Sequence, residues 1–265
     1  MMIGNLLQQL YNVADTLIVG RYLGADALAA VGSAYTLMTF LTSILLGLCM
    51  GSGAAFSIQY GAKNMERLKH SLVLSFALIG MITIVLNLLV FLGLDGIIWF
   101  MQVPGSIAQL MKDYLSAIFW GISATFLYNY FGTLLRSLGN SIVPLVFLGG
   151  SALLNVGLDL WFVLGFQWGI PGAAWATVLS QFIAGLGITA YTLIRFPELR
   201  ISRRHLRWDT GIFRELTSLS FLTCVQQSVM NFGILMVQGR VNSFGSTVMA
   251  AFAAGETDIL VSTTV

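Results

Sequence analysis

Residues 143–166 read VPLVFLGGSALLNVGLDLWFVLGF, a run whose one charged side chain is Asp159. About 20 consecutive apolar residues are enough for an α-helix to cross the hydrocarbon core of a bilayer. The run therefore predicts a transmembrane helix that carries a carboxylate inside the membrane. Similar runs elsewhere predict six more such helices and the start of an eighth: residues 2–22, 28–58, 70–94, 107–134, 171–194 and 214–240, with the eighth beginning near residue 245.

The composition of the whole chain agrees with these runs. Of its 265 residues, 57% are hydrophobic and 9% are charged, whereas ordinary soluble domains carry about 25% charged residues. This composition excludes a soluble globule, and also a disordered chain, which requires low hydrophobicity and high charge. Both cysteines, Cys49 and Cys224, lie inside apolar runs and do not indicate a disulfide scaffold. The fold class that remains is an all-α, polytopic membrane protein.

The positive charges predict how the chain crosses the membrane. Lys and Arg are retained in cytoplasmic loops, and alternate loops divide the 13 cations into ten and three. We expect a cytoplasmic N-terminus and a location in the plasma or inner membrane. The basic segment 195–213 is then a cytoplasmic linker, either a solvated anchor or an amphipathic segment on the inner leaflet. The ten are Lys63, Arg67, Lys69, Arg136, Arg195, Arg200, Arg203, Arg204, Arg207 and Arg214, and the three are Arg21, Lys112 and Arg240.

The first and seventh runs match each other weakly but in order. The match pairs Gln8-Gln9 with Gln226-Gln227 and Gly20-Arg21 with Gly239-Arg240. Parallel internal repeats of this kind occur in secondary transporters. The repeat predicts three parts: a six-helix transmembrane lobe (1–194), an inter-lobe linker (195–213) and an incomplete second lobe (214–265).

Two acids, Asp15 and Asp159, lie within predicted spans, and neither has a nearby Lys or Arg in its own helix. A carboxylate in the membrane costs several kcal/mol, so such an acid is a functional hypothesis by default. Helical spacing places Gln8 and Asn12 on the face of Asp15, and Asn155 on the face of Asp159.

The next helix adds a polar stripe of Thr177 and Gln181. Carboxylate, amide and hydroxyl oxygens suit a proton or Na⁺ better than a transition metal. The alternative is that these polar groups only hold helices together, and for Asn155 or Thr177 taken alone we favour it. For the two aspartates we favour function.

Aromatic residues are frequent between Tyr114 and Phe131. They could present π faces to an organic cation, although we favour lipid-facing packing. The sequence has no HExxH, CxxC, GxSxG or phosphate-loop motif. We therefore expect that the protein is not an enzyme and that it has no catalytic residues, no cofactor and no metal beyond a possible Na⁺.

Four segments together resemble the multidrug and toxic compound extrusion (MATE) family of antiporters. They are GNLLQQLYNVADTLIVGRYLGADALAAVGSAY (4–35), GLCMGSGAAFSIQYGAKN (47–64), LLRSLGNSIVPL (134–145) and LLNVGLDLWFVLGFQWGIPGAAWATVLSQ (153–181). The resemblance implies twelve helices in two six-helix lobes, around a cleft that opens alternately to each side. It also implies a monomer that exports small organic cations across the lipid bilayer in exchange for H⁺ or Na⁺, without nucleic-acid partners.

The resemblance implies a cation site as well. By motif position, Asp15, Asn155, Asp159 and Thr177 would bind the coupling ion. Tyr114 matches a family tyrosine near that site. Together with Gln8, Asn12 and Gln181 it forms the set that we expect to line the site or the substrate path.

The chain also departs from the family pattern. The family has a fuller first helix, so we expect this sequence to lack its start. The last ten residues, ETDILVSTTV (256–265), do not resemble the expected continuation and suggest a truncation or a frameshift, so Glu256 and Asp258 are not used as site residues.

Three alternatives stay open. One is a flippase for a lipid-linked sugar, although it would favour cations in the cleft, where this chain has almost none. The others are a membrane assembly or regulatory subunit and a truncated fragment that does not transport.

Overall fold

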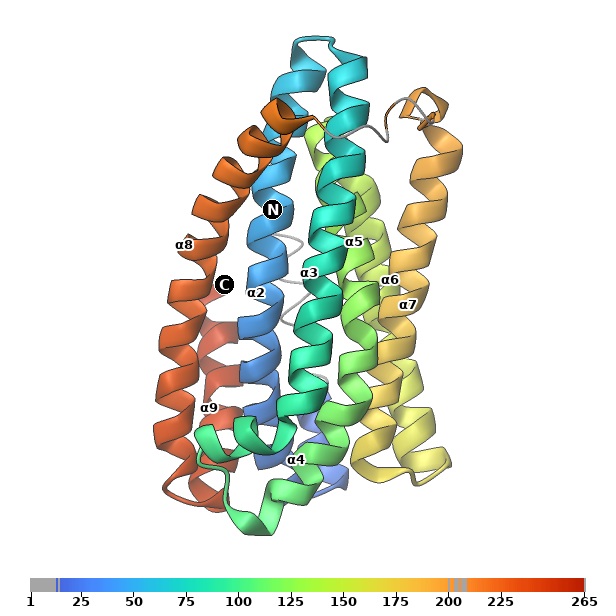
Figure 1. Ribbon diagram of the computed structural model, residues 1–265. Coiled ribbons are helices and arrows are strands. Elements are labelled where there is room, and N and C mark those ends of the chain that lie inside the picture. The colour runs from blue at the N-terminus through green and yellow to red at the C-terminus, as the bar shows by residue number, and fades with distance from the viewer. Residues whose placement is uncertain (1–12, 14, 200, 203–204, 206–208, 265) are drawn as a thin grey trace.

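The computed structural model describes residues 13, 15–199, 201–202, 205 and 209–264, with side chains up to residue 255. The described residues form an elongated bundle of helices whose axes run along its length (Figure 1). Residues 15–22 are helical and precede the labelled helices. These are α2 (Ala25–Gly61), α3 (Met65–Phe100), α4 (Gly105–Ile118), α5 (Ile122–Ser137), α6 (Ile142–Asp159), α7 (Gly169–Arg195), α8 (Thr210–Asn242) and α9 (Ser246–Thr264), with short helical turns η1 (Phe119–Gly121), η2 (Leu160–Gly165) and η3 (Pro197–Leu199).

Within the described residues, five helices are long and apolar enough to cross a membrane, judged by length and composition: α2, α3, α6 together with η2, α7 and α8. The all-α membrane architecture expected from the sequence is therefore confirmed. The predicted single helix over 107–134 is wrong in one respect, because η1 divides it into α4 and α5. The break lies at Gly121, whose carbonyl also accepts a hydrogen bond from Thr125 Oγ1 at 3.1 Å. Such side-chain bonds to the preceding turn bend helices.

α2 lies inside the bundle. α8 and α9 pack on one side of it, and α5, α6 and α7 stand on the other (Figure 1). Small residues such as Ala30, Ala34 and Ala55 are fully buried along α2 and let its neighbours approach closely. The helices before and after the linker are thus in direct contact along α2.

The loops gather at two ends of the bundle. The linker end carries the turns at 62–64 and 138–141 and the described residues 196–199, 201–202, 205 and 209, and the far end carries the turns at 101–104, 166–168 and 243–245 (Figure 1). The described members of the two cation groups lie toward opposite ends, as the alternation of loops requires. Lys63, Arg67, Lys69, Arg136, Arg195 and Arg214 are near the linker end, and Arg21, Lys112 and Arg240 are nearer the far end.

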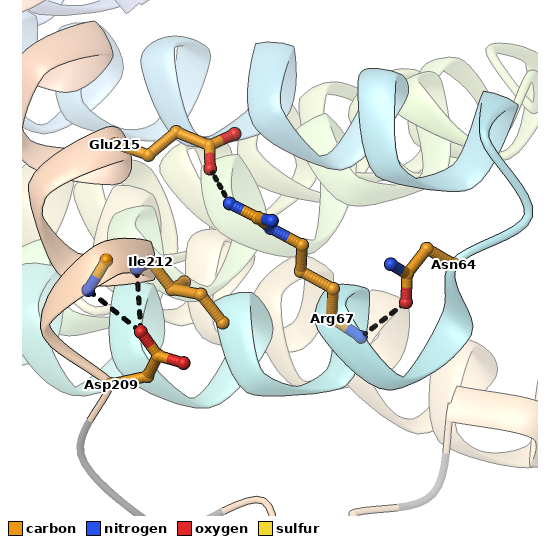
Figure 2. A network of polar contacts seen from close by, with 6 residues as sticks. Asn64, Arg67, Asp209, Ile212 and Glu215 are labelled. Atoms are coloured by element: carbon orange, nitrogen blue, oxygen red, sulfur yellow. Dashed lines mark hydrogen bonds and ion pairs between the residues drawn. The ribbon is translucent and has the colours of Figure 1, made fainter.

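Polar contacts fix the starts of α3 and α8 at the linker end (Figure 2). The Asn64 side chain accepts a hydrogen bond from Arg67 N at 3.1 Å. Asp209 Oδ1 accepts from Gly211 N at 2.8 Å and from Ile212 N at 3.0 Å. Arg67 Nη2 lies 2.6 Å from Glu215 Oε2 and so ties α3 to α8. Both helices begin with an N-cap residue of the preferred type.

The cap of α8 makes the stability of this end depend on pH. The backbone N–H groups of Ile212 and Gly211, with attraction from Arg67 and His70, hold the pKa of Asp209 below its usual range. A lowered pKa in the folded state means that the ionised cap stabilises the fold above the ordinary Asp pKa of about 4. That stabilisation disappears as the pH falls through the folded-state pKa.

We therefore expect Asp209→Ala to lower the thermal unfolding temperature at pH 7, with the difference shrinking as the pH approaches 3. Asp209→Asn is the matched control, because asparagine caps helices without a charge, and it should lose less. Thermal unfolding in detergent at both pH values measures the effect. An equal difference at pH 7 and pH 3 would contradict this role for the carboxylate.

Candidate functional site

Three of the predicted site residues meet between α6 and α7. Asn155 and Asp159 are each 0% exposed, and Thr177 is 4% exposed. With its amide oxygen facing α7, Asn155 accepts hydrogen bonds from Thr177 Oγ1 and Thr177 N, both at 3.2 Å. Its amide nitrogen then donates to Asp159 Oδ2 at 2.9 Å. The amide therefore connects the carboxylate of α6 to the hydroxyl of α7.

The local sequence explains why these groups face one another. Asn155 and Asp159 are four residues apart and so share one face of α6, and this face meets α7. One turn earlier on the same face, Ser151 Oγ donates to Ser180 O at 3.0 Å, and Ser180 Oγ donates to Thr177 O at 2.9 Å. Asn155 and Asp159 therefore share the face of α6 that meets α7, and Ser151 adds a further contact between these two helices.

Asp15 approaches this cluster from the helical segment 15–22. The charges of the Asp15 and Asp159 carboxyl groups repel each other when both groups are ionised. Within the described part of the chain, Asp15 Oδ1 and Asp159 Oδ1 are buried and accept no hydrogen bond. Two carboxylates cannot both stay charged at a buried site unless a cation accompanies them. The free oxygens are therefore suited to hold a proton or a small cation.

The ligand chemistry favours a hard cation over a transition metal. Among the described residues, no group of three His, Cys, Asp or Glu side chains comes together. The donors at this place are two carboxylates, an amide and a hydroxyl, and oxygen ligands suit Na⁺-like ions. The site can exchange one cation for another without any redox or covalent step.

A π-helical turn, η2, follows Asp159 directly, and no feature of the sequence predicted it. Phe166 N donates to Trp161 O at 3.0 Å, five residues back. Such turns are rare and often occur at functional sites. A hollow of about 300 Å³ lies beside η2 at the far end, lined by Tyr22, Leu23, Val163, Leu164, Gln167 and Gly169. No proline marks the turn, so the sequence offers no clear signal for it.

The remaining predicted site residues have different outcomes. Gln8 and Asn12 lie outside the described residues. Gln181, one turn after Thr177, accepts a hydrogen bond from Thr125 Oγ1 at 2.8 Å and so joins α7 to α5. Tyr114 is buried in the hydrophobic core of the bundle. Gln181 therefore connects α7 to α5, and Tyr114 packs in the core of the bundle.

The favoured lipid-facing interpretation of the aromatic residues is largely wrong. Phe119, Phe126 and Tyr130 are buried, whereas Trp120 is exposed. Tyr130 Oη donates to Leu72 O at 2.7 Å, and its ring contacts Phe56 edge-on. These aromatic side chains face α2 and α3 and form part of the core.

Comparisons with known proteins agree with this architecture. A family model described as MatE matches residues 1–161. Two proteins of Bacillus subtilis (strain 168), the probable multidrug resistance proteins YpnP and YoeA, are 30% and 29% identical over 257 and 259 residues. These matches cover 96% and 95% of this chain and 56% of each relative, so the chain spans little more than half the length of these relatives.

Solved structures show the same fold. An inward-facing multidrug resistance MATE family transporter of the MOP superfamily matches with a TM-score of 0.83 at 23% identity. The match covers 93% of this chain and 56% of that one. At this identity the likeness concerns the fold alone.

Proposed function

Because this chain belongs to the MatE family, we propose that it exports organic cations across the cell membrane in exchange for H⁺ or Na⁺. The chain is a multi-pass membrane protein. Relatives that carry the name multidrug resistance protein support an efflux role. The observation that carries the proposal is the pair of acids, Asp15 and Asp159, each with a buried carboxyl oxygen that accepts no hydrogen bond within the described chain.

The site acts by charge balance. An incoming cation or proton neutralises the repulsion between Asp15 and Asp159, and Asn155 keeps Asp159 in position through its 2.9 Å hydrogen bond. Thr177 supplies a hydroxyl oxygen on the opposite helix. When the ion leaves, the unbalanced charge favours either a new ion or a cationic substrate. The site cannot bind the coupling ion and the cationic substrate tightly at the same time. Binding of one therefore promotes release of the other, and the two are exchanged.

The proposed cycle uses two lobes and a fixed orientation. Residues 1–194 form the first lobe, 195–213 the linker and 214–265 the beginning of the second lobe. The linker end faces the cytoplasm, since ten of the 13 cations belong to its loops. The coupling ion enters from the outside and the organic cation leaves to the outside.

Transport by the purified chain in liposomes tests this function. Vesicles loaded with a cationic dye receive either a pH gradient or a Na⁺ gradient. We expect one of the two to drive dye transport, and a matching ionophore should abolish it. A rate of dye transport that is the same with and without each gradient would contradict an ion-coupled exporter.

The same vesicles separate the flippase alternative from export. A flippase would move a fluorescent lipid-linked phosphate between leaflets, and it would favour cations that meet the phosphate inside the membrane. The described Lys and Arg residues lie toward the two ends of the bundle, which counts against this function. Movement of the lipid-linked phosphate between leaflets without any transport of the dye would favour the flippase.

A further inference from the structure

The contact between α2 and α8 changes character along its length. It is polar toward the far end and consists of small residues nearer the linker end. α2 precedes the linker and α8 follows it, so this contact is the seam between the two lobes of the proposed function. The inference below rests on that proposal.

The polar part is a cluster of four side chains, Ser33 and Thr36 from α2 and Gln238 and Asn242 from α8, here called the seam cluster. Ser33 Oγ donates to Asn242 Oδ1 at 2.9 Å and accepts from Gln238 Nε2 at 3.0 Å. Thr36 Oγ1 donates to Gln238 Oε1 at 3.4 Å. Every member is between 0% and 4% exposed.

The seam cluster reaches a third helix and carries no charge. Asn242 Nδ2 donates to Met101 O, at the end of α3, at 2.8 Å. Within α8, Gln238 Nε2 also donates to Asn242 Oδ1 at 2.9 Å. Four of the five hydrogen bonds therefore join α8 to α2 or α3. If α8 moved away, these polar groups would lose their partners together.

The environment decides whether such a separation is possible. A polar group left unpaired in hydrocarbon costs several kcal/mol. Water replaces the lost partner, so that each bond then favours the closed seam by only about threefold. The seam can therefore part at the seam cluster when water enters between the helices, but not when lipid does.

The small-residue part of the seam behaves differently. A Cβ atom at Gly47 would overlap the backbone of Cys224, and one at Gly51 would overlap the backbone of Ser220. Ser220 Oγ lies 3.2 Å from Ser52 Oγ and donates to Leu48 O at 3.2 Å. The two helix backbones touch here, and the contact leaves no room for water.

The two parts lie well apart along α2. Eleven residues separate Thr36 from Gly47, which is about 17 Å at 1.5 Å per residue. Beyond the small-residue contact, toward the linker end, the Arg67–Glu215 ion pair has side chains that are 48% and 29% exposed. Ion pairs already in water contribute little to holding surfaces together.

We infer that the seam cluster is a latch that closes the far end of the transport pathway, and that the contact of Gly47 and Gly51 with α8 is the fulcrum. When water enters the far end, the four hydrogen bonds exchange for bonds to water and α8 tilts about the fulcrum. The ion pair at the linker end adjusts without opposing the movement.

Paired spin labels test the latch in liposomes. One pair, Asp26→Cys with Arg240→Cys, uses exposed positions flanking the seam cluster, and the other, Lys63→Cys with Arg214→Cys, reports on the linker end. Both pairs are placed in a chain with Cys49→Ala and Cys224→Ala. The test variant combines Ser33→Ala with Asn242→Leu, which removes three of the four inter-helix bonds.

Each inter-helix hydrogen bond in a membrane shifts an equilibrium by about threefold. We expect the variant to raise the open-to-closed ratio at the far-end pair by about twentyfold. The linker-end pair should show no lengthening. Thr39→Ala is the matched control, because its hydroxyl bonds within α2 to Tyr35 O at 2.9 Å, and it should leave both distances unchanged. An unchanged far-end distance, or equal lengthening at both ends, would overturn the inference.

A cross-link covers the case in which the double variant does not fold. Ser33→Cys with Asn242→Cys places two thiols where the present side chains touch. Oxidation joins these two thiols in a disulfide, and the distance between the far-end spin labels should then stay short when a cationic dye is added. Reduction of the disulfide should restore the population with the longer distance. Lengthening in the oxidised protein would overturn the latch. Because the readout is distance, a chain that opens without exporting dye contradicts the proposed function and leaves the latch supported.

Discussion

Asp159→Asn is expected to abolish ion-driven export, lowering the initial rate of dye transport about 100-fold or more, or at least about 2.7 kcal/mol. Asparagine keeps the shape of aspartate and can still bond to Asn155, but it cannot bind or release a proton and holds Na⁺ without a full charge. The carboxyl oxygen that accepts no hydrogen bond within the described chain is the atom that this variant removes. Dye export from proteoliposomes under the gradient that drives the unaltered chain measures the effect.

The matched control is Asp95→Asn. Asp95 lies near the far end of α3, where its exposed carboxylate pairs with Lys112 at 2.5 Å. Its loss removes the same charge from a surface where solvent already screens it, so export should stay near the original rate. Thermal unfolding of both variants separates lost transport from lost folding. Export by Asp159→Asn at the rate of the control would remove Asp159 from the coupling mechanism.

Gly51→Leu is expected to destabilise the bundle strongly. The new side chain would overlap the backbone of Ser220 in α8, and a backbone cannot rotate away as a side chain can. Overpacking of this kind costs about 1–3 kcal/mol and occasionally more, and this site belongs at the upper end. A lower thermal unfolding temperature in detergent should report the loss.

Gly93→Leu in α3 is the corresponding control. A Cβ at Gly93 meets no atom within 4 Å, so the added side chain extends into free space on the helix surface and the unfolding temperature should change little. Equal unfolding temperatures for the two variants would mean that α2 and α8 do not touch at Gly51.

Much of the fold follows from the sequence because helix geometry is regular. Apolar runs of the right length predicted the positions of the long helices, and the spacing of Asn155 and Asp159 predicted a polar face on α6. The structure directs this face at Thr177 on α7. Spacing of four residues is enough for such a prediction, since the helical period does not depend on the neighbours.

Side-chain environment was harder to predict. Lipid tails are as apolar as a protein core, so hydrophobicity alone does not tell whether Phe119 or Tyr130 faces lipid or protein. Both are buried. The turn η1 depends on local contacts such as the one between Thr125 and Gly121. Neither η1 nor the π-helical turn η2 contains a proline that would have predicted it from the sequence.

The seam cluster was also missed, although a signal existed. Gln238 and Asn242 are four residues apart in an apolar helix, the same pattern that identified Asn155 and Asp159. Neither is charged, and an amide in a membrane helix is less costly than a carboxylate. Ser33 and Thr36, their partners in α2, lie about 200 residues earlier in the chain. A single sequence does not show which residues so far apart are in contact.

Cation binding to the purified chain, without any gradient, tests whether Asp159 belongs to the site of the coupling ion. Binding of radioactive Na⁺ tests for Na⁺ as the coupling ion. A pH indicator tests for H⁺, because it detects protons that are released when a cationic dye is added. We expect the unaltered chain to give a saturable signal in one of the two measurements and Asp159→Asn to give none, while Asp95→Asn keeps the signal. An undiminished signal from Asp159→Asn would contradict the assignment of Asp15, Asn155, Asp159 and Thr177 as the site of the coupling ion.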